Sequence, residues 1–114
     1  KLIKAVAEFC KARSMRFLLV SIATDAYIGE NIKKYKDLDS SFNANFFDDD
    51  LRDYAQGLNI EYLGLQRTFN QFYENHGTFL HWGQNGDLGH WNYDGHKLVA
   101  DALANKLKLL NENG

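Results

Sequence analysis

The segment from Phe17 to Ala23 is a nearly continuous apolar run that only Ser21 interrupts. The run is too short for a helix that stands alone, and its residues favour extended structure. An apolar run of this kind is typical of a strand buried on both faces, as in a parallel sheet. A second short run, residues 60–65, predicts another strand. The chain must therefore supply helices that cover both strands.

Amphipathic segments flank the two predicted strands. Three of them carry apolar residues at helical spacing, namely Leu2–Arg13, Asp48–Gly57 and Gln66–Asn75. Asp48 is the expected N-cap of the second helix, and Gly77 is expected to end the third. A last helix follows the predicted N-cap Asn92 and runs to the C-terminal end. Residues 24–45 have no firm period, and we interpret them as a long excursion over the carboxyl edge of the sheet, where ligand sites gather in open α/β folds.

The order of these elements constrains the fold. Strands that are separated by helices pair in parallel, and a parallel sheet needs cover on both faces and usually more than two strands. The sequence therefore predicts an α/β protein that is part of a three-layer α/β/α sandwich of flavodoxin-like character. An N-terminal half, or a second copy of the chain, is expected to cover the exposed strand edges and helix faces.

Composition narrows the classes of partner. A formal net charge of -2 and a single short basic run, residues 33–36, argue against nucleic acid, because phosphate binding needs a concentrated basic face. No apolar run reaches the length needed to cross a bilayer. Cys10 is the only cysteine, which excludes an internal disulfide and favours a packing role on the first helix. Nothing in the composition indicates a cofactor or a cellular compartment.

A glycine-rich turn carries the chemistry-bearing residues. Asp87 and His90 lie three positions apart and directly follow Gly86 and Gly89, whose conformational freedom lets both side chains be aimed into a cleft. A neutral imidazole can accept a proton near pH 7, and a carboxylate on its other nitrogen orients the ring. The pattern predicts a general base with its orienting acid. The alternative is that Asp87 caps the turn and His90 is merely a polar residue before a helix.

The run Asp-x-x-His-Trp-Asn-x-x-Gly-His-x-x-x-Ala, residues 87–100, resembles the C-terminal signature block of the SGNH hydrolases, also called the GDSL lipase/acylhydrolase family. The resemblance implies a serine esterase in which His90 is the general base of a Ser-His-Asp triad. It implies that Asp87 is the acid that fixes the tautomer of His90. It also implies the flavodoxin-like sandwich predicted above.

The nucleophile block of that family has no counterpart in this sequence. Its serine lies in a Gly-Asp-Ser context near the start of the domain, and none of the four serines here has that context. These serines are Ser14, Ser21, Ser40 and Ser41. Gly29-Glu30-Asn31 only weakly matches the family's Gly-x-Asn-Asp block. We therefore expect residues 1–114 to be the C-terminal part of a single SGNH hydrolase-like domain, with the nucleophilic serine in a missing N-terminal half.

Other residues near the turn suggest a ligand pocket. His81, Trp82 and Trp91 surround it, and their rings are predicted to bind substrate by lining an acyl or sugar pocket, although core packing explains them equally well. A metal site is not predicted, because zinc needs three or four convergent ligands and no helical His-x-x-x-His spacing occurs.

Several functions remain open at this level. The resemblance implies hydrolysis of an ester substrate, which could be a lipid, an acetylated carbohydrate or a small ester. An acyltransferase that forms the same acyl-enzyme would present the same histidine and aspartate. A non-catalytic SGNH-like module, which has lost its nucleophile block and serves binding or assembly, is the alternative from a different class.

Overall fold

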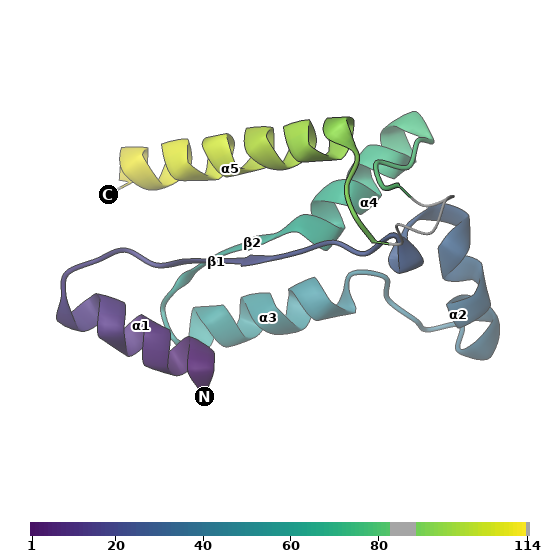
Figure 1. The fold of residues 1–114 in the computed structure, drawn as a ribbon. Helices are drawn as coiled ribbons and strands as arrows, with labels where there is room; N and C mark the ends of the chain where they lie inside the picture. Colours follow the sequence, from purple (N-terminus) through teal and green to yellow (C-terminus); the bar gives the residue numbers. More distant parts are fainter. Residues whose placement is uncertain (83–88, 114) are drawn as a thin grey trace.

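The computed structural model describes residues 1–82 and 89–113 (Figure 1). Its helices are α1 (Leu2–Ala12), α2 (Lys33–Leu38), α3 (Phe46–Gly57), α4 (Leu65–His76) and α5 (Tyr93–Asn113). Two short 3-10 helices, η1 (Asp25–Tyr27) and η2 (Gly29–Ile32), precede α2. The strands are β1 (Leu18–Ser21) and β2 (Glu61–Gly64). The chain is thus a mixed α/β protein with a high helical content.

The two strands pair in parallel, as predicted. Leu18 lies opposite Glu61, and Ser21 lies opposite Gly64. Leu18, Leu19 and Val20 are half-buried instead of buried on both faces as the sequence suggested. The reason is that each strand has only one neighbouring strand among the described residues.

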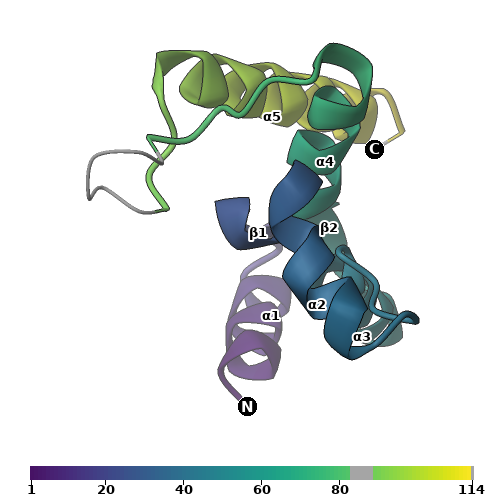
Figure 2. The same cartoon turned by 90° about the vertical axis from the view of Figure 1, so that its right-hand side faces the viewer.

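Helices lie on both sides of the strand pair (Figures 1 and 2). In Figure 1, α5 runs above the strands, and α1 and α3 lie below them. Lys106 of α5 places its Nζ 3.6 Å from Oε2 of Glu61 in β2. Arg16, just before β1, donates a hydrogen bond of 2.9 Å to the carbonyl oxygen of Leu110. These contacts join the C-terminal half of α5 to the amino ends of the two strands.

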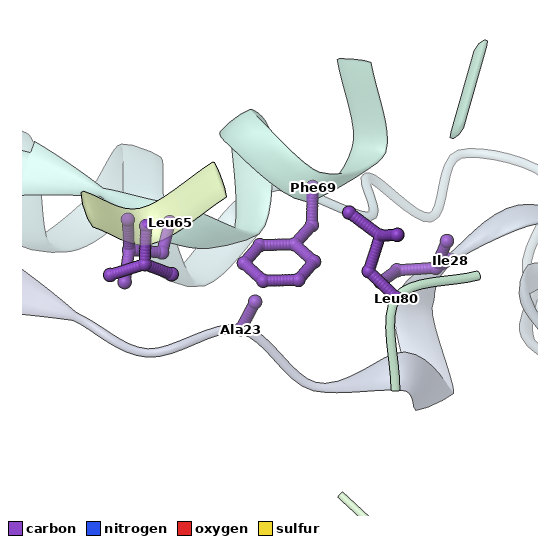
Figure 3. Packing of buried hydrophobic residues seen from close by; sticks show 6 residues of the cluster. Ala23, Ile28, Leu65, Phe69 and Leu80 are labelled. Carbon is purple, nitrogen blue, oxygen red and sulfur yellow. The ribbon is translucent and has the colours of Figure 1, made fainter. Parts of the chain in front are cut away.

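The hydrophobic core gathers segments that are far apart in the sequence. Its buried members are Ala23, Ile28, Leu65, Phe69, Leu80 and Val99. Figure 3 shows the ring of Phe69 between Leu65 and Leu80, over Ala23. Phe69 is only 2% exposed. The segment that follows β1, helix α4, the segment around Leu80 and the start of α5 therefore meet around one aromatic ring.

Residues 24–45 are more ordered than the sequence suggested. The segment lies beyond the carboxyl end of β1, on the right in Figure 1, as predicted, but η1, η2 and α2 occupy much of it although its sequence has no firm period. The ring of Tyr27 lies 5.2 Å from Tyr35, 5.4 Å from Phe42 and 5.7 Å from Phe46, measured between centroids. Aromatic contacts among residues that follow no common period hold these short helices together, and a search for periodicity does not detect them.

Of two residues predicted to bound helices, Gly77 does so and Asp48 does not. Gly77 ends α4 with a φ of 65°, in the left-handed conformation that glycine adopts without strain, as predicted. Asp48 is not the N-cap of α3, because that helix begins at Phe46, after Asn45. Asp48 lies inside the first turn and is buried. Its carboxylate is used for contacts to the strands and to α4.

The packing of α1 and the hydropathy of the helices also bear on the sequence-based predictions. Cys10 is buried, in agreement with the predicted packing role on the first helix. In the described part of the chain, no helix is both long enough and apolar enough to span a membrane.

Candidate active site

His90 lies in a short antiparallel pairing of two segments. The backbone N–H of Trp82 donates to the carbonyl oxygen of His90 at 2.8 Å, and that of Asn92 donates to the carbonyl oxygen of Leu80 at 2.8 Å. His81 and Trp91 form the bridge between these two hydrogen bonds. The backbone of His90 is thus fixed to residues 80–82 immediately before α5 begins.

The start of α5 is fixed by a cap and by close packing. The Oδ1 atom of Asn92 accepts a hydrogen bond of 2.8 Å from the backbone N–H of Gly95, which confirms the predicted N-cap. A Cβ atom on Gly95 would lie 2.5 Å from the carbonyl oxygen of Leu80, so only glycine lets the helix approach this closely. His90 therefore stands two residues before a capped and tightly packed helix N-terminus.

The imidazole of His90 is exposed. The N-terminal end of α5 and the segment with His90 lie beyond the carboxyl ends of β1 and β2, on the right in Figure 1. This is the edge of a parallel sheet at which ligand sites occur in open α/β folds. Asp87 lies outside the described residues, so its pairing with His90 stays a prediction.

His81 lies in the core and not on the surface around His90. It is 6% exposed, and its ring centroid lies 5.0 Å from that of Phe69. Its Nε2 atom lies 3.5 Å from the carbonyl oxygen of Ala23. Burial lowers the pKa of the imidazole, while the contact with Ala23 and the charge of Asp25 act in the opposite direction. This environment favours the packing alternative over the predicted role in substrate binding.

The two tryptophans have different surroundings. Trp91 is half-buried and stacks on Phe69 with ring centroids 5.7 Å apart, which gives it a packing role. Trp82 is 48% exposed and meets Tyr93, itself 83% exposed, in a T-shaped contact of 5.7 Å between centroids. An exposed aromatic pair therefore flanks the segment with His90, and the substrate-binding role of Trp82 stays a prediction.

Tyr93 was missed by the sequence analysis. It lies three positions after His90, at the first helical position of α5, and it does not belong to the apolar stripe that includes Leu98 and Val99. The signal that identifies it is a large aromatic residue outside the stripe of its own helix and beside a candidate base.

The serines of the chain do not complete a triad with these residues. Ser21 is buried and donates a hydrogen bond of 2.6 Å to Oδ1 of Asp48. Ser41 donates to the carboxylate of Asp39 in its own loop. In the portions 1–82 and 89–113, no serine hydroxyl forms a hydrogen bond with a histidine. Among the residues that the structure describes, His90 is thus a candidate base on the surface with no serine hydroxyl bonded to it.

A cavity of about 550 Å³ lies elsewhere, between α1 and the segment that joins α3 to β2. Phe17 and Ile60, the residues that precede the strands, are among its lining residues. The cavity therefore lies at the amino ends of the strands, away from His90. It contains none of the predicted site residues, so its size alone does not make it the site of chemistry.

The chain matches no protein-family model, no curated protein and no solved structure. Residues 87–100 and the surroundings of His90 are therefore the features of this chain that indicate a function.

Proposed function

We propose that this chain supplies the general base of a serine ester hydrolase of the SGNH type. His90 removes the proton from the attacking serine and later protonates the leaving alcohol, and Asp87 holds its tautomer. The observation that carries the proposal is the exposed imidazole of His90, at the carboxyl edge of a parallel strand pair and directly before a capped helix. The Trp82–Tyr93 pair would line one side of the ester-binding surface.

The nucleophilic serine comes from outside the 114 residues in this proposal. Ser21 donates to Asp48 and Ser41 donates to Asp39, so no serine hydroxyl among the described residues is hydrogen-bonded to a histidine. A serine attacks an ester only when a base within hydrogen-bond reach activates it. An N-terminal half of the same domain would bring this serine to His90.

The same N-terminal half, or a second copy of the chain, would cover apolar surface. Leu2 and Phe9 of α1 and Ile22 after β1 are large apolar side chains that are exposed. Covering them with further strands and helices would complete a three-layer α/β/α sandwich. Burial of this surface would stabilise the assembly at roughly 25 cal/mol for each Å² removed from water.

The test compares His90→Ala with the matched control His96→Ala in the intact protein. Both histidines are exposed and lie near the start of α5, but His96 lies inside the helix. Hydrolysis of p-nitrophenyl acetate is expected to fall by about 10³-fold or more in kcat for His90→Ala, because the base acts in the chemical step. His96→Ala should keep kcat within about a factor of three.

Other outcomes would favour the alternatives. Normal turnover by His90→Ala would exclude His90 as the base. Transfer of the acetyl group to an added alcohol in preference to water would assign the same residues to an acyltransferase. Binding without any turnover, with no serine labelled by a fluorophosphonate in the intact protein, would favour a non-catalytic module.

A further inference from the structure

The backbone of His90 is hydrogen-bonded to that of residues 80–82. Trp82 donates to the carbonyl oxygen of His90 at 2.8 Å, and His81 pairs with Trp91, the next residue along the chain. A shift of the segment around His81 would therefore displace the carbonyl group of His90. The question is what holds that segment in place.

The side chain of His81 contacts two fixed groups. Its ring packs on Phe69, at the centre of the core, with centroids 5.0 Å apart. Its Nε2 atom lies 3.5 Å from the carbonyl oxygen of Ala23, and Nε2 must be the donor because a carbonyl oxygen only accepts. One side chain thus connects the segment before His90 to the segment that follows β1.

The carbonyl of Ala23 is held by the next residue. The backbone N–H of Thr24 donates to Oε1 of Gln66 at 2.8 Å, and Nε2 of Gln66 donates to the carbonyl oxygen of Thr24 at 3.1 Å. Gln66 is buried on α4, one turn before Phe69. Helix α4 therefore holds both groups that the His81 side chain contacts.

The choice of histidine for this position has a cost. Its Nδ1 atom is buried and has no hydrogen-bond partner among the described residues. A leucine or phenylalanine would pack on Phe69 without burying an unpaired nitrogen. What an imidazole adds over an apolar side chain is the Nε2–H that faces Ala23.

We infer that His81 is a positioning residue for His90, because its Nε2 contact with Ala23 fixes the backbone pairing that carries His90 to the start of α5. The consequence for catalysis rests on the proposed function. The consequence for backbone order does not, and it can be measured separately.

The chain allows a matched pair of substitutions. In His81→Gln, the amide nitrogen can reach the place of Nε2 and donate to Ala23. In His81→Asn, the amide nitrogen reaches only as far as Nδ1, so this donor is lost. His81→Phe keeps the contact with Phe69 without any donor and serves if His81→Asn does not fold.

Hydrogen exchange in the intact protein gives a readout that needs no activity. The Trp82 amide, which donates to His90, is expected to exchange about ten-fold faster in His81→Asn and His81→Phe, and within about three-fold of wild type in His81→Gln. The Ile60 amide, which donates to Ala55 at 3.0 Å far from the site, is the internal control and should keep its rate.

Kinetics on p-nitrophenyl acetate then tests the catalytic consequence. His81→Asn should lower kcat by about ten-fold with an unchanged KM, and His81→Gln should restore most of kcat. Equal acceleration of exchange at Trp82 and Ile60 would reduce His81 to a core residue and overturn the inference. Equal rates of Trp82 amide exchange in His81→Gln and His81→Asn would overturn the inference as well. If His90→Ala retains turnover, the proposed function fails, but exchange at Trp82 still decides whether His81 positions the backbone of His90.

Discussion

Ser21 and Asp48 form a buried hydrogen bond of 2.6 Å that links β1 to α3. The hydroxyl of Tyr62 on β2 lies 2.6 Å from Ser21 Oγ and 3.0 Å from the same carboxylate oxygen of Asp48. The other oxygen of Asp48 accepts from the backbone N–H of Arg67 at 2.8 Å, in the first turn of α4. From its position in α3, Asp48 thus contacts both strands and helix α4. Its negative charge is also favourable near the N-terminus of α4, because the helix dipole is positive there.

This arrangement predicts that Ser21 is not a nucleophile. In the intact protein, a fluorophosphonate is expected to leave Ser21 unlabelled, because its hydroxyl is buried and donates to Asp48 with no histidine as base. Mass spectrometry of the labelled peptides checks this. Ser21→Ala should keep esterase turnover while lowering the free energy of unfolding by about 1 kcal/mol. Label on Ser21 would contradict the assignment of the nucleophile to a segment outside this sequence.

Asp48 is predicted to be a major contributor to stability. Asp48→Asn should lower the free energy of unfolding by about 2 kcal/mol, because its amide group cannot accept from all three donors. The matched control is Asp50→Asn, at an exposed position of the same helix. This substitution should change the free energy of unfolding by less than about 0.5 kcal/mol. Denaturant unfolding of both variants checks the difference. Equal changes in the free energy of unfolding for the two variants would show that an amide can replace the buried carboxylate.

Acidification is predicted to destabilise the protein through His81. Burial lowers the pKa of this imidazole in the folded chain below its ordinary value of about 6.5. As the pH falls below about 6.5, the unfolded chain takes up a proton that the folded chain resists, so the free energy of unfolding decreases. Denaturant unfolding between pH 7.5 and 5.5 should show a smaller decrease for His81→Gln than for wild type. An equal decrease in His81→Gln and wild type would show that His81 does not cause the acid destabilisation.

Alkaline pH is predicted to destabilise the protein through the ionisation of Tyr62. Burial raises the pKa of its phenol to about 12 in the folded chain; the hydrogen bond with Ser21 partly opposes this rise, and the neighbouring carboxylate of Asp48 adds to it. Between about pH 10 and 12 the unfolded chain loses this proton while the folded chain keeps it, so stability declines as the pH rises. Tyr62→Phe should flatten the decline in denaturant unfolding over this range. An unchanged slope would show that Tyr62 titrates alike in both states.

The sequence by itself determined the features that depend on neighbouring residues. The apolar run at 17–23 and the run at 60–65 predicted both strands and their parallel pairing. Gly77 and Asn92 predicted a helix end and a helix start, because backbone conformation and capping involve residues only a few positions apart.

Tertiary structure alone decided the roles of the polar and aromatic side chains. Aspartate is a residue type typical of an N-cap, but the carboxylate of Asp48 accepts a hydrogen bond from Ser21, 27 positions away. His81 was grouped with Trp82 and Trp91 as a pocket residue, yet it faces Ala23, 58 positions away, in the core. Tyr93 meets Trp82 only because the fold brings the segment after α4 beside the start of α5. A local pattern states which residue types can pack or donate, but a buried hydrogen bond or ring contact forms only where the folded chain brings its two distant partners together and removes water from between them.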